Sequence, residues 1–258
     1  MIFISLISTA SAMLAITVAT LTIGGSAVIA GMIGFSDGAG SPYHFFAPAW
    51  SKVLLFFSFV RVRVHNREGA MAGPRIYVVN HMSYYDVPVL SSFIPRAKFV
   101  TKEELFSIPV FGKAMRAIGM VPISRDNKRA AFSAYDAAAR SLRNGNSIVV
   151  FAEGTRGRKY GIRPLKSGPF VLAITAGVPI VPVLIHGTHE VLPRGSIMVT
   201  PRRVDVHLLE QVSVEGFDAS SRDEVASAVW ARLAEALESL YGVESEPRHS
   251  AAAAAISS

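Results

Sequence analysis

His81 and Asp86 are the two residues of this sequence best suited to acid–base chemistry. They follow residues 76–79, a short apolar run that predicts a buried strand, so His81 lies where a rigid strand gives way to a loop. A carboxylate that accepts a hydrogen bond from one imidazole nitrogen leaves the other nitrogen free to act as a base. Five residues turn about 140° along an ideal helix, so the two side chains meet only if His81 precedes the helix and Asp86 lies in its first turn.

A second polar group follows another predicted strand, residues 147–152, and consists of Glu153, Gly154, Thr155 and Arg156. In open α/β sheets, ligands bind at the carboxyl ends of strands. The planar guanidinium of Arg156 suits a phosphate, and Gly154 lets the backbone approach a ligand closely. A lone His–Asp pair is often a solvated loop pair, and a lone Glu and Arg often form a salt-bridged loop. Together, at the ends of two different strands, the two groups indicate a phosphate-ester site.

The composition of the 258 residues narrows the function classes. Half of the residues are apolar and the mean hydropathy is +0.37, which makes membrane contact the first expectation. The absence of Cys excludes a disulfide framework, a thiolate zinc site and a Cys nucleophile. A net charge of +7 favours anionic partners such as phosphates, acidic carrier proteins or anionic lipids. No zinc-finger, recognition-helix or RNA-binding aromatic signature is present, so no nucleic-acid partner is expected.

The N-terminal residues 1–35 contain no charged side chain and no His. About 20 apolar residues cross a bilayer, so residues 2–23 are long enough to span, with Gly24 and Gly25 offering a break before residues 26–35 return or lie within the membrane. We expect a membrane anchor over residues 1–35. A cleaved secretory signal is the alternative, but its usual basic start is missing. A buried soluble hairpin is the other, and the uninterrupted apolar length argues against it.

A second apolar stretch, residues 43–60, contains Trp50 and Lys52 among Phe and Leu, which suits a helix at the membrane interface. Core packing against the following domain explains the pattern equally well. We therefore expect an interfacial helix and linker over residues 36–65. Basic residues near this stretch outnumber acidic ones and place the rest of the chain in the cytoplasm: Lys52, Arg61, Arg63 and Arg67.

From Arg75 onward, short apolar runs alternate with helical segments, which predicts an α/β domain over residues 66–243. The expected fold is a mixed, largely parallel central sheet flanked by helices, after an N-terminal membrane-embedded helical segment. Expected strands cover 76–79, 98–101, 120–123, 147–152, 180–185, 197–200 and 204–209. Expected helices cover 84–92, 110–118, 128–143, 168–176 and 221–241. Residues 244–258, with five consecutive alanines, have nothing to pack and are expected to form a disordered tail.

The order of the motifs resembles that of the glycerolipid acyltransferases. The segment from Asn80 to Asp86 resembles their first motif and residues 153–156 their third. Residues 99–105, with Pro109, Gly112, Gly119 and 122–125, look like the second, and residues 178–183 like the fourth. The resemblance covers about residues 75–193 and is strongest to the bacterial 1-acyl-sn-glycerol-3-phosphate acyltransferases. Three positions depart from the family's usual residues, with Ala152 for Pro, Gly157 for Ser and Leu165 for Phe.

The resemblance implies an acyltransferase of phospholipid biosynthesis at the cytoplasmic side of the inner membrane. The donor would be an acyl-CoA or acyl-carrier-protein thioester as co-substrate, with no further cofactor. The acceptor would be the sn-2 hydroxyl of lysophosphatidic acid, and the product phosphatidic acid. Other acceptors stay open, namely glycerol 3-phosphate, a lysophospholipid with a larger headgroup or a lyso-aminolipid. Two alternative functions belong to other classes of protein. One is an esterase or thioesterase that activates water, and the other is a non-catalytic membrane scaffold with a basic lipid-binding face.

Within this chemistry, His81 is the expected general base and Asp86 orients its imidazole. No Gly-x-Ser-x-Gly nucleophile elbow surrounds Ser83, so Ser83 is interpreted as a loop-shaping hydroxyl rather than a nucleophile. The resemblance assigns the acceptor phosphate to a set of mostly basic residues, with Glu153, Gly154 and Thr155 shaping the pocket: Arg125, Arg156 and, more weakly, Lys102 and Lys166. His186 and His189 have a spacing that metal sites use, but Gly187 favours a turn, and no metal is expected.

Overall fold

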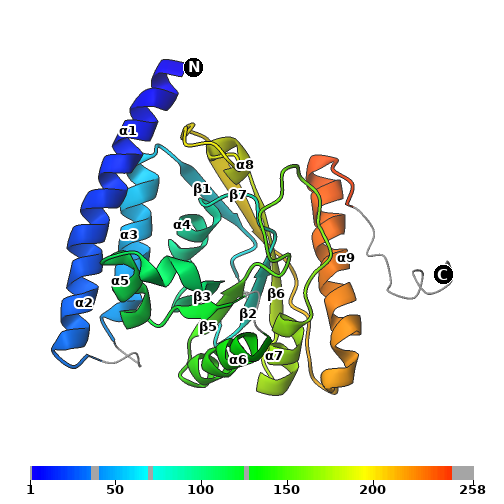
Figure 1. Cartoon of the computed structure of the whole chain (residues 1–258). Helices are drawn as coiled ribbons and strands as arrows, with labels where there is room; N and C mark the ends of the chain where they lie inside the picture. Colours follow the sequence, from blue (N-terminus) through cyan, green and yellow to red (C-terminus); the bar gives the residue numbers. More distant parts are fainter. Residues whose placement is uncertain (1, 36–40, 69–71, 125–127, 246–258) are drawn as a thin grey trace.

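The computed structural model describes residues 2–35, 41–68, 72–124 and 128–245. Its centre is a seven-stranded sheet in the order β1-β7-β6-β2-β5-β3-β4 (Figure 1). Neighbouring strands run parallel except β6 and β7, which are antiparallel. The strands are β1 (Arg61–His65), β2 (Ile76–Val79), β3 (Ala97–Lys102), β4 (Val121–Ile123), β5 (Ser147–Val150), β6 (Ile180–His186) and β7 (Arg203–Leu208). The mixed, largely parallel sheet predicted from the sequence is confirmed.

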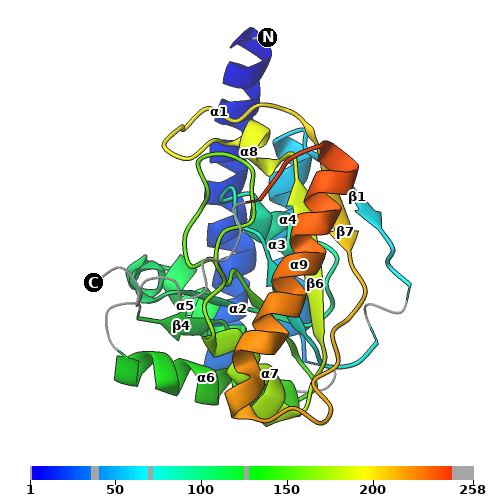
Figure 2. The same cartoon turned by 90° about the vertical axis from the view of Figure 1, so that its right-hand side faces the viewer.

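Alternate residues of the central strands supply two separate cores. In β2, Ile76 and Val78 face helices α6 (Lys128–Arg143), α7 (Gly168–Ala176) and α9 (Arg222–Tyr241), whereas Tyr77 and Val79 face α3 (Tyr43–Phe57) and α4 (Asp86–Ser91). Both faces of the sheet are thus covered by helices, which explains why its strands read as continuous apolar runs (Figure 2). The parallel strands β2, β5 and β3 end at one edge, and this edge receives the loops that carry His81 and Arg156.

The N-terminal segment is one continuous helix, made of α1 (Ile2–Ala19), a π-helical turn η1 (Thr20–Gly24) and α2 (Gly25–Met32). The expected break at Gly24 and Gly25 is wrong, because both glycines have helical backbone angles. The helix has the length and composition to cross a membrane. It lies along the rest of the molecule, however, beside α3 (Figure 1). Its small residues face inward: Ser5, Ser8, Ala12, Ala15, Ala19, Gly24, Ala27 and Ala30.

Helix α3 packs between α1 and α4. Its Leu54 and Leu55 are buried, and the indole N–H of Trp50 donates to Thr20 Oγ1 at 3.1 Å. Phe45 and Phe56 on the same helix remain exposed. The stretch that sequence alone could assign to the membrane interface or to the core therefore packs against the domain and also presents aromatic side chains outward.

Two strand assignments differ from the sequence-based expectation. Strand β1 lies in the segment expected to be a linker and pairs with β7 from Arg61 to His65. The sequence predicts a strand over residues 197–200, but these residues belong to no strand and lie beside α1, where the Val199 N–H donates to Thr9 Oγ1. The remaining short elements are η2 (Glu103–Ser107), α5 (Phe111–Ala117), α8 (Thr188–Val191) and η3 (Ala219–Ser221).

Candidate active site

The His81–Asp86 pair forms as the sequence predicts. His81 lies in the loop after β2, Asp86 is the first residue of α4, and His81 Nδ1 lies 2.7 Å from Asp86 Oδ2. A carboxylate accepts this bond from Nδ1–H, so the other ring nitrogen, Nε2, carries the lone pair. One face of the imidazole stacks on Phe151, with ring centroids 4.0 Å apart. The pair has the arrangement of an oriented general base.

The carboxylate of Asp86 also shapes the turn that carries His81. Its Oδ2 accepts hydrogen bonds from the backbone N–H groups of Met82 at 2.7 Å and Ser83 at 2.9 Å. The side chain is completely buried, which makes these bonds strongly stabilising for an ionised group. The Ser83 hydroxyl donates to the carbonyl of Leu192 at 2.8 Å. This hydrogen bond joins two loops, which agrees with the interpretation of Ser83 as a loop-shaping hydroxyl.

Asn80, for which the sequence suggested no role, fixes the point where the loop leaves the sheet. Its side-chain amide donates to the Ile185 carbonyl at 2.9 Å and its carbonyl accepts from the Ile185 N–H at 2.8 Å. This pair of bonds replaces a backbone pair between β2 and β6. The sheet is therefore continued by a side chain while the backbone turns away to present His81.

Glu153 holds the two motif loops together. Its Oε1 accepts from the His81 N–H at 3.1 Å, and its Oε2 accepts from Arg163 Nε at 2.6 Å. The Gly157 N–H donates to the His81 carbonyl at 2.7 Å, so both backbone groups of His81 are bound to one loop. Burial raises the pKa of Glu153, and Arg163 partly offsets this effect. The sequence placed Glu153 in substrate binding, but its carboxylate is directed at His81 and Arg163.

The other residues of the third motif lie around this contact. Gly154 has a φ of 77°, a backbone conformation that favours glycine, and the end of the Lys166 side chain lies beside it. The Thr155 carbonyl accepts from Arg163, and the Thr155 side chain is exposed. Arg156 lies over the ring of Tyr84, with Cζ 3.6 Å from the ring centroid. The structure thus brings Arg156 and Lys166 to the same edge of the sheet as His81.

Two further basic residues, Lys102 and Arg125, were also predicted to bind the acceptor phosphate. Lys102 ends β3 at the same edge of the sheet and lies 3.8 Å from Glu104, with its side chain half exposed. Arg125 lies outside the described residues. The sequence named Asn80 only as the start of the first motif and did not name Arg163. In the structure Asn80 bonds Ile185 and Arg163 binds Glu153.

A large apolar cavity begins beside His81. Its volume is about 540 Å³, within the usual range for ligand pockets. Phe151, which stacks on His81, forms part of its wall together with Tyr84 and Leu192. The cavity extends between the N-terminal helix, α3 and α5, where its walls include Ile16, Ala27, Trp50, Phe111, Met115 and Ile118.

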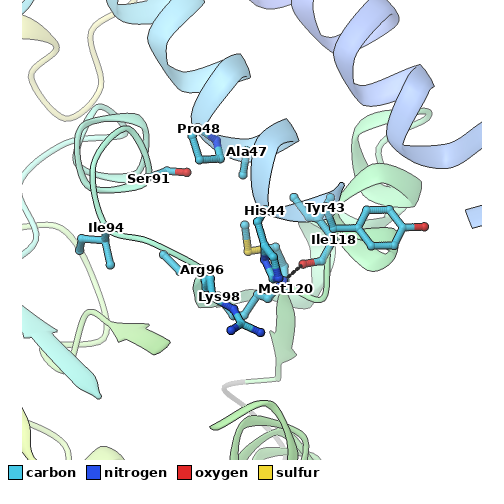
Figure 3. Close-up of a pocket in the computed structure, with 11 residues that line it drawn as sticks. Tyr43, His44, Ala47, Pro48, Ser91, Ile94, Arg96, Lys98, Ile118 and Met120 are labelled. Atoms are coloured by element: carbon cyan, nitrogen blue, oxygen red, sulfur yellow. Dashed lines mark hydrogen bonds between the residues drawn. The ribbon is translucent and has the colours of Figure 1, made fainter. Parts of the chain in front are cut away.

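A small second cavity adjoins the far end of the large one, because Ala47, Ser91, Ile118 and Met120 line both. Figure 3 shows Lys98 in its wall, with the Lys98 ammonium donating to the Ile118 carbonyl at 2.6 Å. Its volume of about 10 Å³ holds no more than a water molecule. Lys98 is the second residue of β3 and pairs with Ile148 of β5, so it lies away from the carboxyl ends of the strands, where His81 is found. The small cavity is therefore separate from the acid–base pair.

A stack of aromatic and imidazole rings fastens the loop that carries Arg156. Tyr160 stacks on His186 at 4.4 Å, and His186 stacks on Tyr241 of α9 at 3.7 Å. The Tyr160 hydroxyl donates to Glu190 at 2.7 Å and accepts from the Gly187 N–H at 2.8 Å. Burial lowers the pKa of His186 and raises that of Tyr160, which favours the neutral rings that stack. His186, considered above as a metal ligand, therefore packs between two tyrosines.

The fold and the site define a class. A His-x4-Asp pair and a Glu-Gly-Thr-Arg segment meet at neighbouring strand ends of a mixed sheet, next to an apolar cavity and an N-terminal apolar helix. This is the combination of motifs found in glycerolipid acyltransferases. Residues 61–186 match the model of the Acyltransferase family. Residues 61–186, about half of the chain, therefore form an Acyltransferase-family domain.

Individual relatives extend the likeness. A chloroplastic 1-acyl-sn-glycerol-3-phosphate acyltransferase of Brassica napus is 33% identical over 156 residues, which cover 60% of this chain and 45% of the relative. The 1-acyl-sn-glycerol-3-phosphate acyltransferase of Salmonella typhimurium is 35% identical over 162 residues, 58% of this chain and 66% of the relative. The chain spans about half the length of the first plant relatives it matches.

A solved structure covers almost the whole chain. The crystal structure of the 1-acyl-sn-glycerophosphate acyltransferase PlsC from Thermotoga maritima matches with a TM-score of 0.78 and 27% sequence identity. The match covers 94% of this chain and 98% of that protein. The likeness therefore includes the N-terminal helical region as well as the sheet.

The position of Glu153 gives a first prediction. Glu153→Gln removes the charge that pairs with Arg163 and should loosen the backbone of His81, so kcat for acyl transfer should fall about tenfold or more. The KM values of both substrates should change less than about twofold, because the Glu153 side chain is buried. Steady-state kinetics check this, with Glu210→Gln, which breaks an exposed pair with Arg232, as the matched control. A raised acceptor KM with unchanged kcat would return Glu153 to substrate binding.

Proposed function

We propose that the chain transfers a fatty acyl group from an acyl-CoA or acyl-carrier-protein thioester to the sn-2 hydroxyl of lysophosphatidic acid, giving phosphatidic acid. The observation that carries this proposal is the oriented His81–Asp86 pair beside an apolar cavity and Arg156. The chain's relatives from Brassica napus and Salmonella typhimurium, which are 1-acyl-sn-glycerol-3-phosphate acyltransferases, support the choice of acceptor.

In the proposed reaction, His81 Nε2 takes the proton from the acceptor hydroxyl as its oxygen attacks the thioester carbonyl. Asp86 holds the imidazole in the required tautomer and stabilises the imidazolium that forms. When the carbon–sulfur bond breaks, the leaving thiolate takes the proton from His81, and the imidazole is neutral again. The acceptor becomes the ester and no residue of the chain is acylated.

The acyl chain of the donor needs an apolar surface and the acceptor phosphate needs cationic groups, and we assign a separate region of the site to each. A fatty acyl chain gains about 0.8 kcal/mol for each CH₂ group that it buries, and the cavity beside Phe151 offers an apolar surface for it. The acceptor phosphate needs cationic donors, which Arg156, over the cavity-lining Tyr84, and Lys166, beside Gly154, supply. We keep Arg125 as a further phosphate ligand from the family resemblance, and Lys102 as a weaker one.

We also propose that the chain binds the cytoplasmic face of the inner membrane through its N-terminal helix, with the helix lying along the surface. Ser5 approaches Thr200 near one end of the helix, and Ala27 and Ala30 pack with Tyr43 and Ala114 near the other. A spanning helix with these contacts would draw the polar surface of the domain into the bilayer. The outward face of the helix is rich in large apolar side chains, including Phe3, Leu6, Leu14, Leu21 and Ile29.

The membrane proposal predicts binding that resists salt. The protein should float with uncharged phosphatidylcholine vesicles in about 1 M NaCl, because salt screens charges but not apolar insertion. Replacing Phe3, Leu14 and Leu21 with Ser should reduce the bound fraction at least about tenfold. Leu240→Ser, which changes an exposed Leu on α9, serves as the control and should leave binding unchanged. Complete release of the wild-type protein by salt would leave only a peripheral electrostatic contact.

The catalytic proposal predicts a ranking of three variants. His81→Ala should lower the rate of phosphatidic acid formation about 10²- to 10⁴-fold. Asp86→Asn should also lower it severely, because the amide favours the wrong imidazole tautomer. Ser83→Ala should cost much less, since its hydroxyl bonds a backbone carbonyl. Initial rates, donor binding and melting temperature are measured together, with products resolved by mass spectrometry.

Each alternative gives a distinct result in this assay. A fully active, folded His81→Ala protein would overturn the mechanism, and a trappable acyl-enzyme lost in Ser83→Ala would replace it with a covalent one. Thiol release that does not depend on an acceptor would indicate a thioesterase. Transfer to glycerol 3-phosphate or another lysolipid, but not to lysophosphatidic acid, would change the acceptor while keeping the chemistry.

A further inference from the structure

Tyr84 and Arg156 meet across the two motif loops. Tyr84 lies three residues after His81, and Arg156 lies three residues after Glu153. The guanidinium carbon of Arg156 is 3.6 Å from the centroid of the Tyr84 ring. At this separation a planar guanidinium avoids overlap with the ring only if the two groups lie face to face. The plane of the guanidinium is thereby defined by a residue of the loop that carries the acid–base pair.

Tyr84 has little to do with the packing of the core. Its side chain is 62% exposed, although neighbouring Tyr85 is buried and bonded to Ser58 Oγ at 2.6 Å. An aromatic ring that stays exposed at the mouth of a cavity gains little from burial, so its contact with Arg156 is its main interaction within the described part of the chain.

Stacking leaves the edges of the Arg156 guanidinium available. Among the described residues no carboxylate pairs with Arg156, whereas Arg163 is engaged by Glu153 and by the Thr155 carbonyl. The backbone of Arg156 is also fixed, because Arg194 donates to its carbonyl at 3.0 Å. A guanidinium that is held by its face, with its N–H groups directed outward in the plane, is prepared to bind two oxygens of one phosphate group.

We propose that Tyr84 is a positioning residue for the acceptor phosphate: its ring holds the Arg156 guanidinium in the orientation that binds a phosphate monoester. This rests on the proposed function, in which Arg156 contacts the acceptor. Tyr84 acts through Arg156 and touches no reacting atom. Because Tyr84 also lines the apolar cavity, a contact with the donor's acyl chain is the competing role, and the two roles differ in which substrate binds more weakly after substitution.

Two substitutions separate the ring from the apolar surface. Tyr84→Phe keeps the ring and removes only the hydroxyl, so the KM for lysophosphatidic acid should stay within about twofold of the wild-type value. Tyr84→Leu keeps an apolar cavity wall but has no aromatic face, so this KM should rise about three- to tenfold. The KM for the donor and kcat should change little in both variants. A Tyr84→Leu effect confined to the donor KM, or an equal loss in Tyr84→Phe, would overturn the proposal.

A double-mutant comparison tests whether Tyr84 acts through Arg156. In an Arg156→Ala background, Tyr84→Leu should cause no further loss of acceptor binding. Equilibrium binding of glycerol 3-phosphate by calorimetry provides a measurement that needs no turnover, so it reports on Tyr84 even if wild-type protein fails to acylate lysophosphatidic acid and the proposed function is wrong. Wild-type binding that Arg156→Ala weakens, and that Tyr84→Leu weakens only when Arg156 is present, supports the proposal. Independent, additive losses would contradict it.

Discussion

The structure of the site depends on one buried carboxylate. Asp86 begins α4 with its side chain fully enclosed, where a charge without partners would cost several kcal/mol. Three N–H groups, from the His81 ring and from the backbone of Met82 and Ser83, are directed at its Oδ2. Bonds of this type contribute about 1.5–3 kcal/mol each. The turn that binds Oδ2 of this carboxylate is therefore the same turn that sets the tautomer of His81.

The loop after β5 extends this arrangement to the second substrate. Glu153 and Gly157 bind the N–H and the carbonyl of His81, so a displacement of one loop also moves the other. Tyr160 then anchors the same loop to β6 and α9 through His186 and Tyr241. The expected base and the expected phosphate ligand are positioned by a common network, which is how a site keeps two substrates in register.

The sequence predicts those strands and site residues whose role follows from their neighbours in the chain. The central strands are covered on both faces, so their continuous apolar runs predict buried strands. Strand β1 lies at the sheet edge and alternates basic and apolar residues, and the sequence predicts a linker there instead. Residues 197–200 do not pair in the sheet, and only Val199 among them is buried, where its N–H donates to Thr9 of α1. The Glu153–His81 and Tyr84–Arg156 contacts join residues 72 apart, and no local pattern reveals such a contact.

Asp86 is expected to hold His81 with Nε2 unprotonated and available to the acceptor hydroxyl. The ¹⁵N chemical shifts of selectively labelled His81, measured in the folded protein at a pH where the ring is neutral, report the tautomer directly. We predict a proton on Nδ1, which donates to Asp86, and none on Nε2. A neutral ring with its proton on Nε2 would contradict the account, because the nitrogen assigned to the acceptor hydroxyl would then have no lone pair to receive its proton.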